Sequence, residues 1–304
     1  IHRSLSDGKV TGMNEFVSKF FLNKSDPSLL VYTQAKSINE PLTELKDLTL
    51  TEDALSSWRD LQNLLRGKFK GQKKYKHVNK ILRRGVLKKD LRDELYCQLC
   101  RQLTPGTKTK MSAVNRRGWM LMKFFTSSFA PSGRLYSVFR NFLTESSAGK
   151  VLTSNDELNV PEWCLCALKT TKKIGPRKFL PTYMEYLSVK ENRSFCLRIK
   201  LLGRDIEGRF GISSQSHHRL SEEKGMPSDP IDLFLNIVDI SSVTCSDLVK
   251  RIGAVIGISD TSGFSVGMIS PSGKDVSFGI MVRIADALWE VEQSMRALKA
   301  RGKE

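Results

Sequence analysis

Apolar side chains in the first two thirds of the chain recur every three or four residues, as they do on one face of an α-helix. Between residues 91 and 103 leucines occupy every fourth position, so their side chains share one helix face. Residues 48–65 show a similar spacing, and Thr51 with the acidic residues that follow it is typical of a helix N-terminus. Both segments are therefore predicted to be amphipathic helices.

Further helical patterns extend this region to about Leu187. Residues 78–87 predict a short helix that leads into the leucine-rich one. Residues 116–132 leave almost no polar face, which is typical of a central buried helix. Amphipathic helices are also expected at residues 135–142 and from Pro161, a residue suited to the first helical turn. The first part of the chain is therefore predicted to be an all-helical bundle.

The periodicity changes near Ser194, where alternating apolar residues and β-branched or aromatic runs replace the helical spacing. A polar surface loop is expected at residues 213–230. Strands followed by a helix, then a further strand region and a helix, describe a small α+β domain. The strands are expected at residues 194–202, 231–240 and 263–273, and the helices at residues 245–258 and 280–298.

The positive charge of the chain is concentrated in one window. The formal net charge of the 304 residues is +17. Between Leu61 and Thr144 there are 20 Lys or Arg residues and three acidic ones, so this window carries the whole excess and the rest of the chain is neutral. A patch of this kind raises the local concentration of polyanionic partners.

The densest part of the window, Arg66–Lys89, holds 11 basic residues and no acidic one. Its partner could be an acidic protein surface, an anionic lipid or nucleic acid. Nucleic acid is disfavoured because the segment offers few aromatic rings for base stacking, chiefly Phe69 and Tyr75. The charge count selects eight candidate binding residues, which are Lys68, Lys70, Lys73, Lys74, Lys76, Lys80, Arg83 and Arg84.

The cysteines do not predict a metal or redox site. Cys97 and Cys100 flank the apolar stripe of a helix, where free thiols act as small hydrophobes, and a redox pair would lie at a helix N-terminus. Neither this pair nor Cys164 and Cys166 has the spacing of a common zinc module. All six cysteines, the others being Cys196 and Cys245, are therefore expected to be free thiols of a reducing compartment, without metal or cofactor.

Catalysis and membrane insertion are not expected either. The segment GFSVG around Ser265 matches a nucleophile elbow, but no histidine follows it to complete a triad. No phosphate-binding loop of the Gly-x-x-x-x-Gly-Lys-Ser/Thr type occurs. No apolar run approaches the roughly 18 residues of a membrane span, and the first residues do not resemble a signal peptide. The sequence predicts a soluble, cytosolic protein that is not an enzyme.

Four segments between about Leu30 and Leu187 together resemble the signature blocks of the myosin tail homology 4 family, in the family's order. They are LRDELYCQLCRQLT, RRGWMLMKFFTSSFAPS, LYSVFRNFL and KKIGPRKFLPTYMEYL. The last block contains the family's exit motif, which is Arg-x-x-Pro-Pro-Ser/Thr. Leu180 stands where many members have the first proline, but Arg177, Pro181 and Thr182 match the other positions. In such proteins a FERM module follows, and its ubiquitin-like first lobe is similar to the α+β pattern here.

This resemblance implies a non-catalytic adaptor, as in tails of class VII, X and XV unconventional myosins and plant calmodulin-binding kinesins. It implies binding to microtubules through basic surface, binding to cargo tails through the tandem, and a cytoplasmic, cytoskeleton-associated location. Asp93, Glu94 and Gln98 match the family helix and are expected to orient neighbouring helices by hydrogen bonds. The expected organisation is an extension at residues 1–30, the helical domain at 31–190 and the ubiquitin-like lobe at 191–304.

Overall fold

The computed structural model describes the chain as two compact units, Ile1–Tyr186 and Leu187–Glu304. The described residues are 12–23, 32–45, 47–104, 113–148, 159–191, 195–201, 231–237, 243–262, 264–269 and 275–301. The expected polar loop at residues 213–230 lies outside them.

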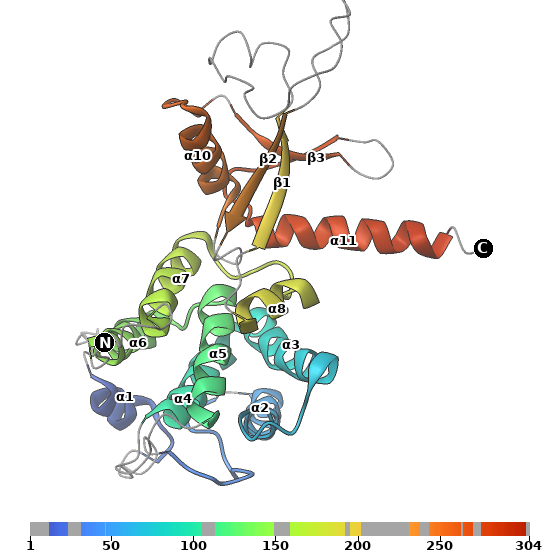
Figure 1. Cartoon of the computed structure of the whole chain (residues 1–304). Coiled ribbons are helices and arrows are strands. Elements are labelled where there is room, and N and C mark those ends of the chain that lie inside the picture. The colour runs from blue at the N-terminus through green and yellow to red at the C-terminus, as the bar shows by residue number, and fades with distance from the viewer. Residues whose placement is uncertain are drawn as a thin grey trace, which may run out of the picture. The chain divides into compact units, whose positions relative to one another are not determined.

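The first unit is a bundle of α-helices, as the apolar spacing predicts (Figure 1). Its first helix, which the sequence patterns did not reveal, lies in the expected N-terminal extension, where Phe16 and Val17 are buried and the helix contacts α6. The elements are α1 (Met13–Phe20), α2 (Leu48–Leu65), α3 (Gly71–Leu87), the short 3-10 helix η2 (Lys89–Leu91), α4 (Arg92–Leu103), α5 (Ala113–Ser128), α6 (Gly133–Ala148), α7 (Val160–Ile174) and the start of α8 (Tyr183–Glu191), which continues into the second unit.

Helix α5 is the central helix of this unit and contacts α2, α3, α4 and α7 (Figure 1). Trp119 is 7% exposed and Phe124 is fully buried, which confirms the prediction of a central apolar helix. Gly118 permits a close approach to α4, because a Cβ atom there would lie 2.8 Å from a side-chain carbon of Leu103. The same logic applies to Gly85 of α3, whose missing side chain leaves room for the ring of Phe129.

Helix α2 occupies the predicted range, but its N-cap is different from the one expected. The side chain of Asp47 accepts a hydrogen bond from the backbone N–H of Thr49 at 2.8 Å, so Asp47 is the cap. Thr51 lies inside the helix, and its expected role as a cap was wrong. The bond from Thr49 to Asp47 gives a partner to a backbone N–H group of the first turn that has none within the helix. The same bond keeps the pKa of the Asp47 carboxyl below its ordinary value.

The second unit combines strand pairs and helices, as predicted. Strands β1 (Phe195–Leu201) and β2 (Ile231–Ile237) are antiparallel, with Phe195 opposite Ile237. Strands β3 (Val266–Ile269) and β4 (Asp275–Phe278) form a second antiparallel pair, with Val266 opposite Phe278. The helices are α10 (Cys245–Ile256) and α11 (Ile284–Arg301). Side chains from both helices meet in one apolar cluster that contains Val243, Cys245, Leu248 and Ile284.

Candidate functional site

Helix α3 carries most of the candidate binding residues, and it begins seven residues earlier than the predicted start at residue 78. Its apolar positions, Val78, Ile81 and Leu82, are almost completely buried and attach the helix to the bundle. The lysine run before Val78 therefore belongs to the helix and is held in a regular array. Sequence spacing could not reveal this start, because the first turns contain no apolar residue other than Tyr75.

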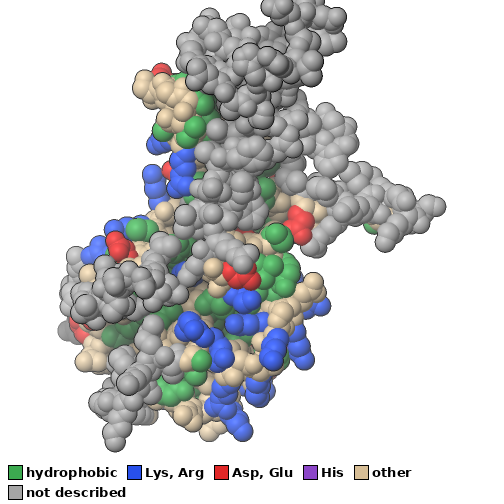
Figure 2. All heavy atoms as spheres, in the orientation of Figure 1, with side chains coloured by type: hydrophobic (Ala, Val, Ile, Leu, Met, Phe, Trp, Pro, Cys, Tyr) green, Lys and Arg blue, Asp and Glu red, His purple; other side chains and the backbone are tan. Residues whose placement is uncertain are grey.

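Six of the eight candidate residues are exposed. On α3 the exposed cations follow one another at intervals of three, four and three residues, so they share the helix face opposite Val78 and Leu82. Figure 2 shows Lys and Arg side chains gathered over this part of the helical unit. The exposed candidates are Lys68 and Lys70 before the helix and Lys73, Lys76, Lys80 and Arg83 on it.

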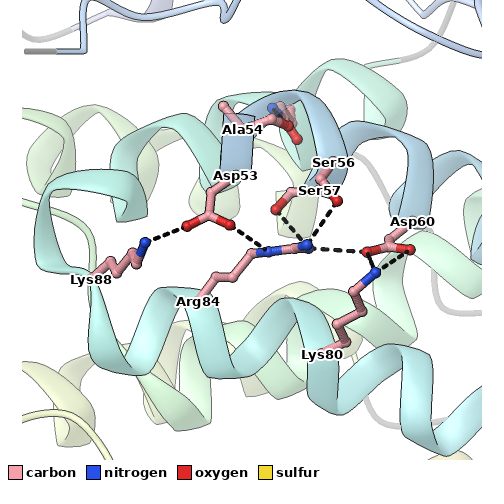
Figure 3. A network of polar contacts seen from close by, with 9 residues as sticks. Asp53, Ala54, Ser56, Ser57, Asp60, Lys80, Arg84 and Lys88 are labelled. Carbon is pink, nitrogen blue, oxygen red and sulfur yellow. Dashed lines mark hydrogen bonds and ion pairs between the residues drawn. The ribbon is translucent and has the colours of Figure 1, made fainter. Parts of the chain in front are cut away.

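Arg84 lies on a different side of α3, facing α2, and its side chain is only 12% exposed. Its guanidinium nitrogens lie 3.2 Å from Asp53 and 3.0 Å from Asp60 (Figure 3). The same group donates hydrogen bonds to the hydroxyl oxygens of Ser56 at 2.8 Å and Ser57 at 3.1 Å. Arg84 therefore joins α3 to α2, and the structure gives it a stabilising role in place of the expected contact with a partner.

Two lysines extend this network along the same side of α3. Lys80 approaches Asp60 at 3.1 Å, and Lys88 approaches Asp53 at 2.6 Å (Figure 3). Their side chains remain 52% and 42% exposed, so each pair contributes little to stability and Lys80 can still face a partner. The spacing of these charges is visible in the sequence. The two carboxylates of α2 are seven residues apart, and the three cations of α3 that pair with them are four residues apart, so each set lies on one face of its helix.

The segment before α3 is held by a ring stack that the sequence analysis did not predict. The rings of Phe69 and His77 are nearly parallel, 5° apart, with their centroids separated by 3.7 Å. The ammonium of Lys73 lies 5.5 Å from the centroid of the Phe69 ring. On its other side, the Nδ1 atom of His77 lies 3.6 Å from a carboxylate oxygen of Asp60. The two stacked rings thus link the exposed Lys73 to the network on α2.

The remaining candidate, Lys74, is half-buried. Two other polar side chains of α3 bind the linker before α8. The hydroxyl of Tyr75 donates to the carbonyl of Pro181 at 3.0 Å, and the amide of Asn79 donates to the same oxygen at 3.1 Å. Lys74 is therefore not part of the exposed row.

The acidic residues of α4 orient neighbouring segments, as predicted. Glu94 accepts hydrogen bonds from the backbone N–H groups of Leu42 and Thr43 and from the amide of Gln98. Gln98 in turn donates to the carbonyl of Ala54 at 3.0 Å. Burial raises the pKa of the Glu94 carboxyl, although these hydrogen bonds oppose the shift.

Asp93 holds the start of α6 by hydrogen bonds, as Glu94 holds the segment at Leu42 and Thr43. Its carboxylate accepts hydrogen bonds from both the backbone N–H and the hydroxyl of Ser132. Burial raises the pKa of this carboxyl too, against the effect of both bonds. Asp93, like Glu94, therefore orients a neighbouring segment of the fold.

The exit motif also has a structural role. Arg177 is 2% exposed, and its guanidinium pairs with the carboxylate of Glu185. Its backbone N–H donates to the carbonyl of Ser128 at 2.8 Å, which ties the segment to the end of α5. The hydroxyl of Thr182 accepts a hydrogen bond from the backbone N–H of Glu185 at 3.2 Å, inside the first turn of α8.

The thiols and the serine motif offer no catalytic arrangement. Cys97 and Cys100 are free and buried, and burial raises the pKa of both thiols, which keeps them protonated and unreactive. Ser265 directly precedes strand β3, so the chain does not turn from a strand into a helix there. Among the described residues, no group of three His, Cys, Asp or Glu side chains could hold a metal ion.

Residues 78–188 match the model of the MyTH4 domain, the myosin tail homology 4 domain. This part of the chain is a MyTH4 domain. The match covers α4 and α5 with most of α3, and continues through the exit motif to α8. Residues 68–76, with their four exposed lysines, lie just before it.

Curated relatives of the chain are unconventional myosins. Myosin-VIIa of Drosophila melanogaster is 29% identical over 192 residues, which are 62% of this chain and 8% of the myosin. Unconventional myosin-XV of Homo sapiens is 26% identical over 187 residues, 61% of this chain and 5% of that protein. The chain thus spans a small part of the relatives it matches.

Solved structures extend the likeness to the second unit. The MyTH4-FERM MF1 domain of Dictyostelium discoideum myosin VII has a TM-score of 0.72 at 21% identity, covering 95% of this chain and 54% of that one. The C-terminal MyTH4-FERM domain of human myosin 7b, solved with the PDZ3 domain of harmonin-a, has a TM-score of 0.62 at 21% identity, covering 96% and 53%. The fold is therefore a helical MyTH4 domain followed by a small α+β lobe of FERM type.

MyTH4-FERM domains of myosin tails are non-catalytic adaptor modules, and this chain has the fold of such a module. Its relatives are cytoskeletal motors. Of the helices that the structure describes, none combines the length and the hydropathy needed to cross a bilayer.

Proposed function

We propose that the chain is a tail module that binds the acidic surface of microtubules through the exposed side of α3, and cargo proteins through the MyTH4-FERM tandem. In this proposal residues 1–30 are an extension, residues 31–190 form the helical domain and residues 191–304 form the ubiquitin-like lobe. The location that follows is cytoplasmic and cytoskeleton-associated.

The observation that carries the microtubule proposal is the exposed row of cations on and before α3. The segment Arg66–Lys89 contains no carboxylate, so its exposed ammonium groups repel one another and favour an acidic partner. Five of these cations, Lys68, Lys70, Lys73, Lys76 and Arg83, lie outside the network that joins α3 to Asp53 and Asp60.

The structure lends less support to the two alternative partners. Phe69 already stacks on His77, so one face of the ring that could receive a nucleic-acid base is occupied. Leu87, 68% exposed, lies four residues beyond Arg83 and would suit contact with an anionic lipid surface. We place lipid second, since a single exposed leucine gives little apolar area for insertion.

Cargo binding is proposed from the tandem as a whole. The human myosin 7b relative was solved as a complex of its MyTH4-FERM domain with a PDZ domain. The chain contains the MyTH4 domain and an α+β lobe of the same fold, so a protein partner is the expected ligand of the tandem. The identity of such a cargo would come from a pull-down with the 304-residue chain, followed by a direct binding measurement with each candidate in purified form.

The microtubule proposal is tested by charge reversal at Lys70, Lys73 and Lys76 together. The matched control reverses Lys169, Lys172 and Lys173, three exposed lysines of α7 with the same total change of charge. Each exposed ion pair contributes roughly 0.2–1 kcal/mol, so losing three should weaken the affinity for microtubules, measured by co-sedimentation, by roughly three- to 100-fold. Equal losses in both variants would mean that bulk charge drives the binding, and undiminished binding by the first variant would refute the proposal.

A direct competition separates the three partner classes. Microtubules, duplex DNA and acidic liposomes are offered to the parent chain at one salt concentration, because all three attractions are screened by salt. Preference for microtubules supports the proposal. Preference for liposomes that is lost on substitution of Leu87 with serine would favour the lipid alternative instead.

A further inference from the structure

The loop between α2 and α3 is fixed at the end where it leaves α2. The guanidinium of Arg117, on α5, donates to the carbonyl of Leu65 at 2.8 Å. Gly67 has a positive φ of 75°, and its backbone N–H donates to the carbonyl of Leu64 at 3.0 Å. The next N–H, that of Lys68, donates to the carbonyl of Asn63 at 3.1 Å. The chain therefore leaves α2 in a defined direction.

The other end of the loop is held by the stack of Phe69 on His77. Since His77 lies on the second turn of α3, the stack draws the loop against the helix that follows it. Phe69 stands between Lys68 and Lys70 in the sequence, and the ammonium of Lys73 lies close to its ring. Fixing this one ring thus restricts the backbone of Lys68 and Lys70 and keeps both close to Lys73, which the helix already holds.

We infer that the Phe69–His77 stack arranges Lys68, Lys70 and Lys73 into a discrete site for an extended acidic peptide segment. This inference rests on the proposed function, in which the basic surface receives an acidic partner. Lysine side chains lose rotamer freedom on binding, and that loss is smaller when their backbone is already fixed. Phe69 is therefore a positioning residue that carries no charge itself.

The length of the surface defines the partner further. From Lys73 to Arg83 the helix rises by about 15 Å, at about 1.5 Å per residue. An extended peptide covers this distance with about five residues, at about 3.3 Å each. A short run of consecutive Glu or Asp residues therefore fits the row, with its end at the stacked loop.

The inference is tested with a labelled synthetic peptide of about ten glutamates, titrated with the 304-residue chain at low salt. Phe69→Ala removes the ring and leaves the net charge unchanged, so we expect binding to weaken about three- to tenfold. Phe69→Tyr keeps the ring and should bind within about twofold of the parent. The matched control is Phe20→Ala, which removes a ring that lies 5.4 Å from the guanidinium carbon of Arg134, far from α3 in the sequence.

The outcomes separate the inference from the proposed function. Equal peptide affinities for Phe69→Ala and the parent, or no peptide binding by the parent, would overturn the inference, even if the parent sediments with microtubules. A peptide effect at Phe69 without co-sedimentation would instead remove the microtubule proposal and leave the inference standing. If Phe69→Ala fails to fold, His77→Gln removes the other ring of the stack, and the same loss of affinity is expected.

Discussion

On the side of α3 that faces α2, the cations at every fourth position meet carboxylates, whereas on the solvent side Lys73, Lys76 and Arg83 are exposed. Arg83 and Arg84 show the difference most directly, because they are consecutive residues of the same type. Arg84 contacts two carboxylates and two hydroxyl groups, while Arg83 is exposed. The net charge of the segment does not distinguish these two arginines. Their positions on the helix do, because Arg84 faces α2 and stabilises the fold, whereas Arg83 faces solvent and is one of the residues proposed to bind a partner.

The largest loss of stability is expected from a substitution on the buried side of α3. Leu82 is fully buried, so Leu82→Ala removes methyl groups from a packed core and leaves a cavity. This should lower the free energy of unfolding by about 2–5 kcal/mol. Chemical denaturation followed by circular dichroism measures the change, and a loss below about 1 kcal/mol would show that α3 is only loosely attached to the bundle.

The second largest loss of stability is expected for Arg84→Ala. It leaves Asp53 and Asp60 without their shared cation and two serine hydroxyls without their donor. Losing one member of a buried ion pair costs roughly 3–5 kcal/mol, and we expect about 2–3 kcal/mol here because the network is partly exposed to solvent. Arg83→Ala is the matched control and should change stability by less than about 0.5 kcal/mol. Similar unfolding curves for both variants would contradict the division of α3 into two sides.

The smallest effect is expected at Lys80, which belongs to both sides. Its pair with Asp60 is half exposed, so Lys80→Ala should reduce stability by only about 0.2–1 kcal/mol, and the difference should shrink in high salt. Microtubule binding should weaken more visibly than stability. A larger loss of stability that persists in high salt would place Lys80 with Arg84 in the network.

Much of the helical unit could be predicted because its apolar residues follow the helical period closely. The range of α2 and the central position of α5 came from that spacing. Helix α1 is only eight residues long, too short for a clear pattern, and was missed. The start of α3 was placed late because lysines fill its first turns, and the cap of α2 was assigned to Thr51 when Asp47 performs that role.

The candidate site could be located from the sequence only as a segment. The charge count found the correct stretch of chain for an exposed basic surface, but it could not separate Arg84 from its neighbours, because the carboxylates that engage it lie 24 and 31 residues earlier. The stack of Phe69 on His77 could not be predicted from the charge count either, because it also depends on a contact between residues that are separated in the sequence. The two rings are eight residues apart, one before α3 and one inside it, and their contact depends on the path of the backbone at the start of α3, where Gly71 has a positive φ of 51°.

The two hydrogen bonds from α3 to the carbonyl of Pro181 have a consequence for the order in which the molecule assembles. They join residues 102 and 106 positions apart, so closing them requires nearly the whole helical unit to have been synthesised. A nascent chain that ends before Pro181 has made all of α3 and its lysines but lacks the oxygen that Tyr75 and Asn79 bind. The helix that carries the basic surface is thus synthesised well before the carbonyl that two of its side chains bind, and this contact can form only after residue 181 has been added.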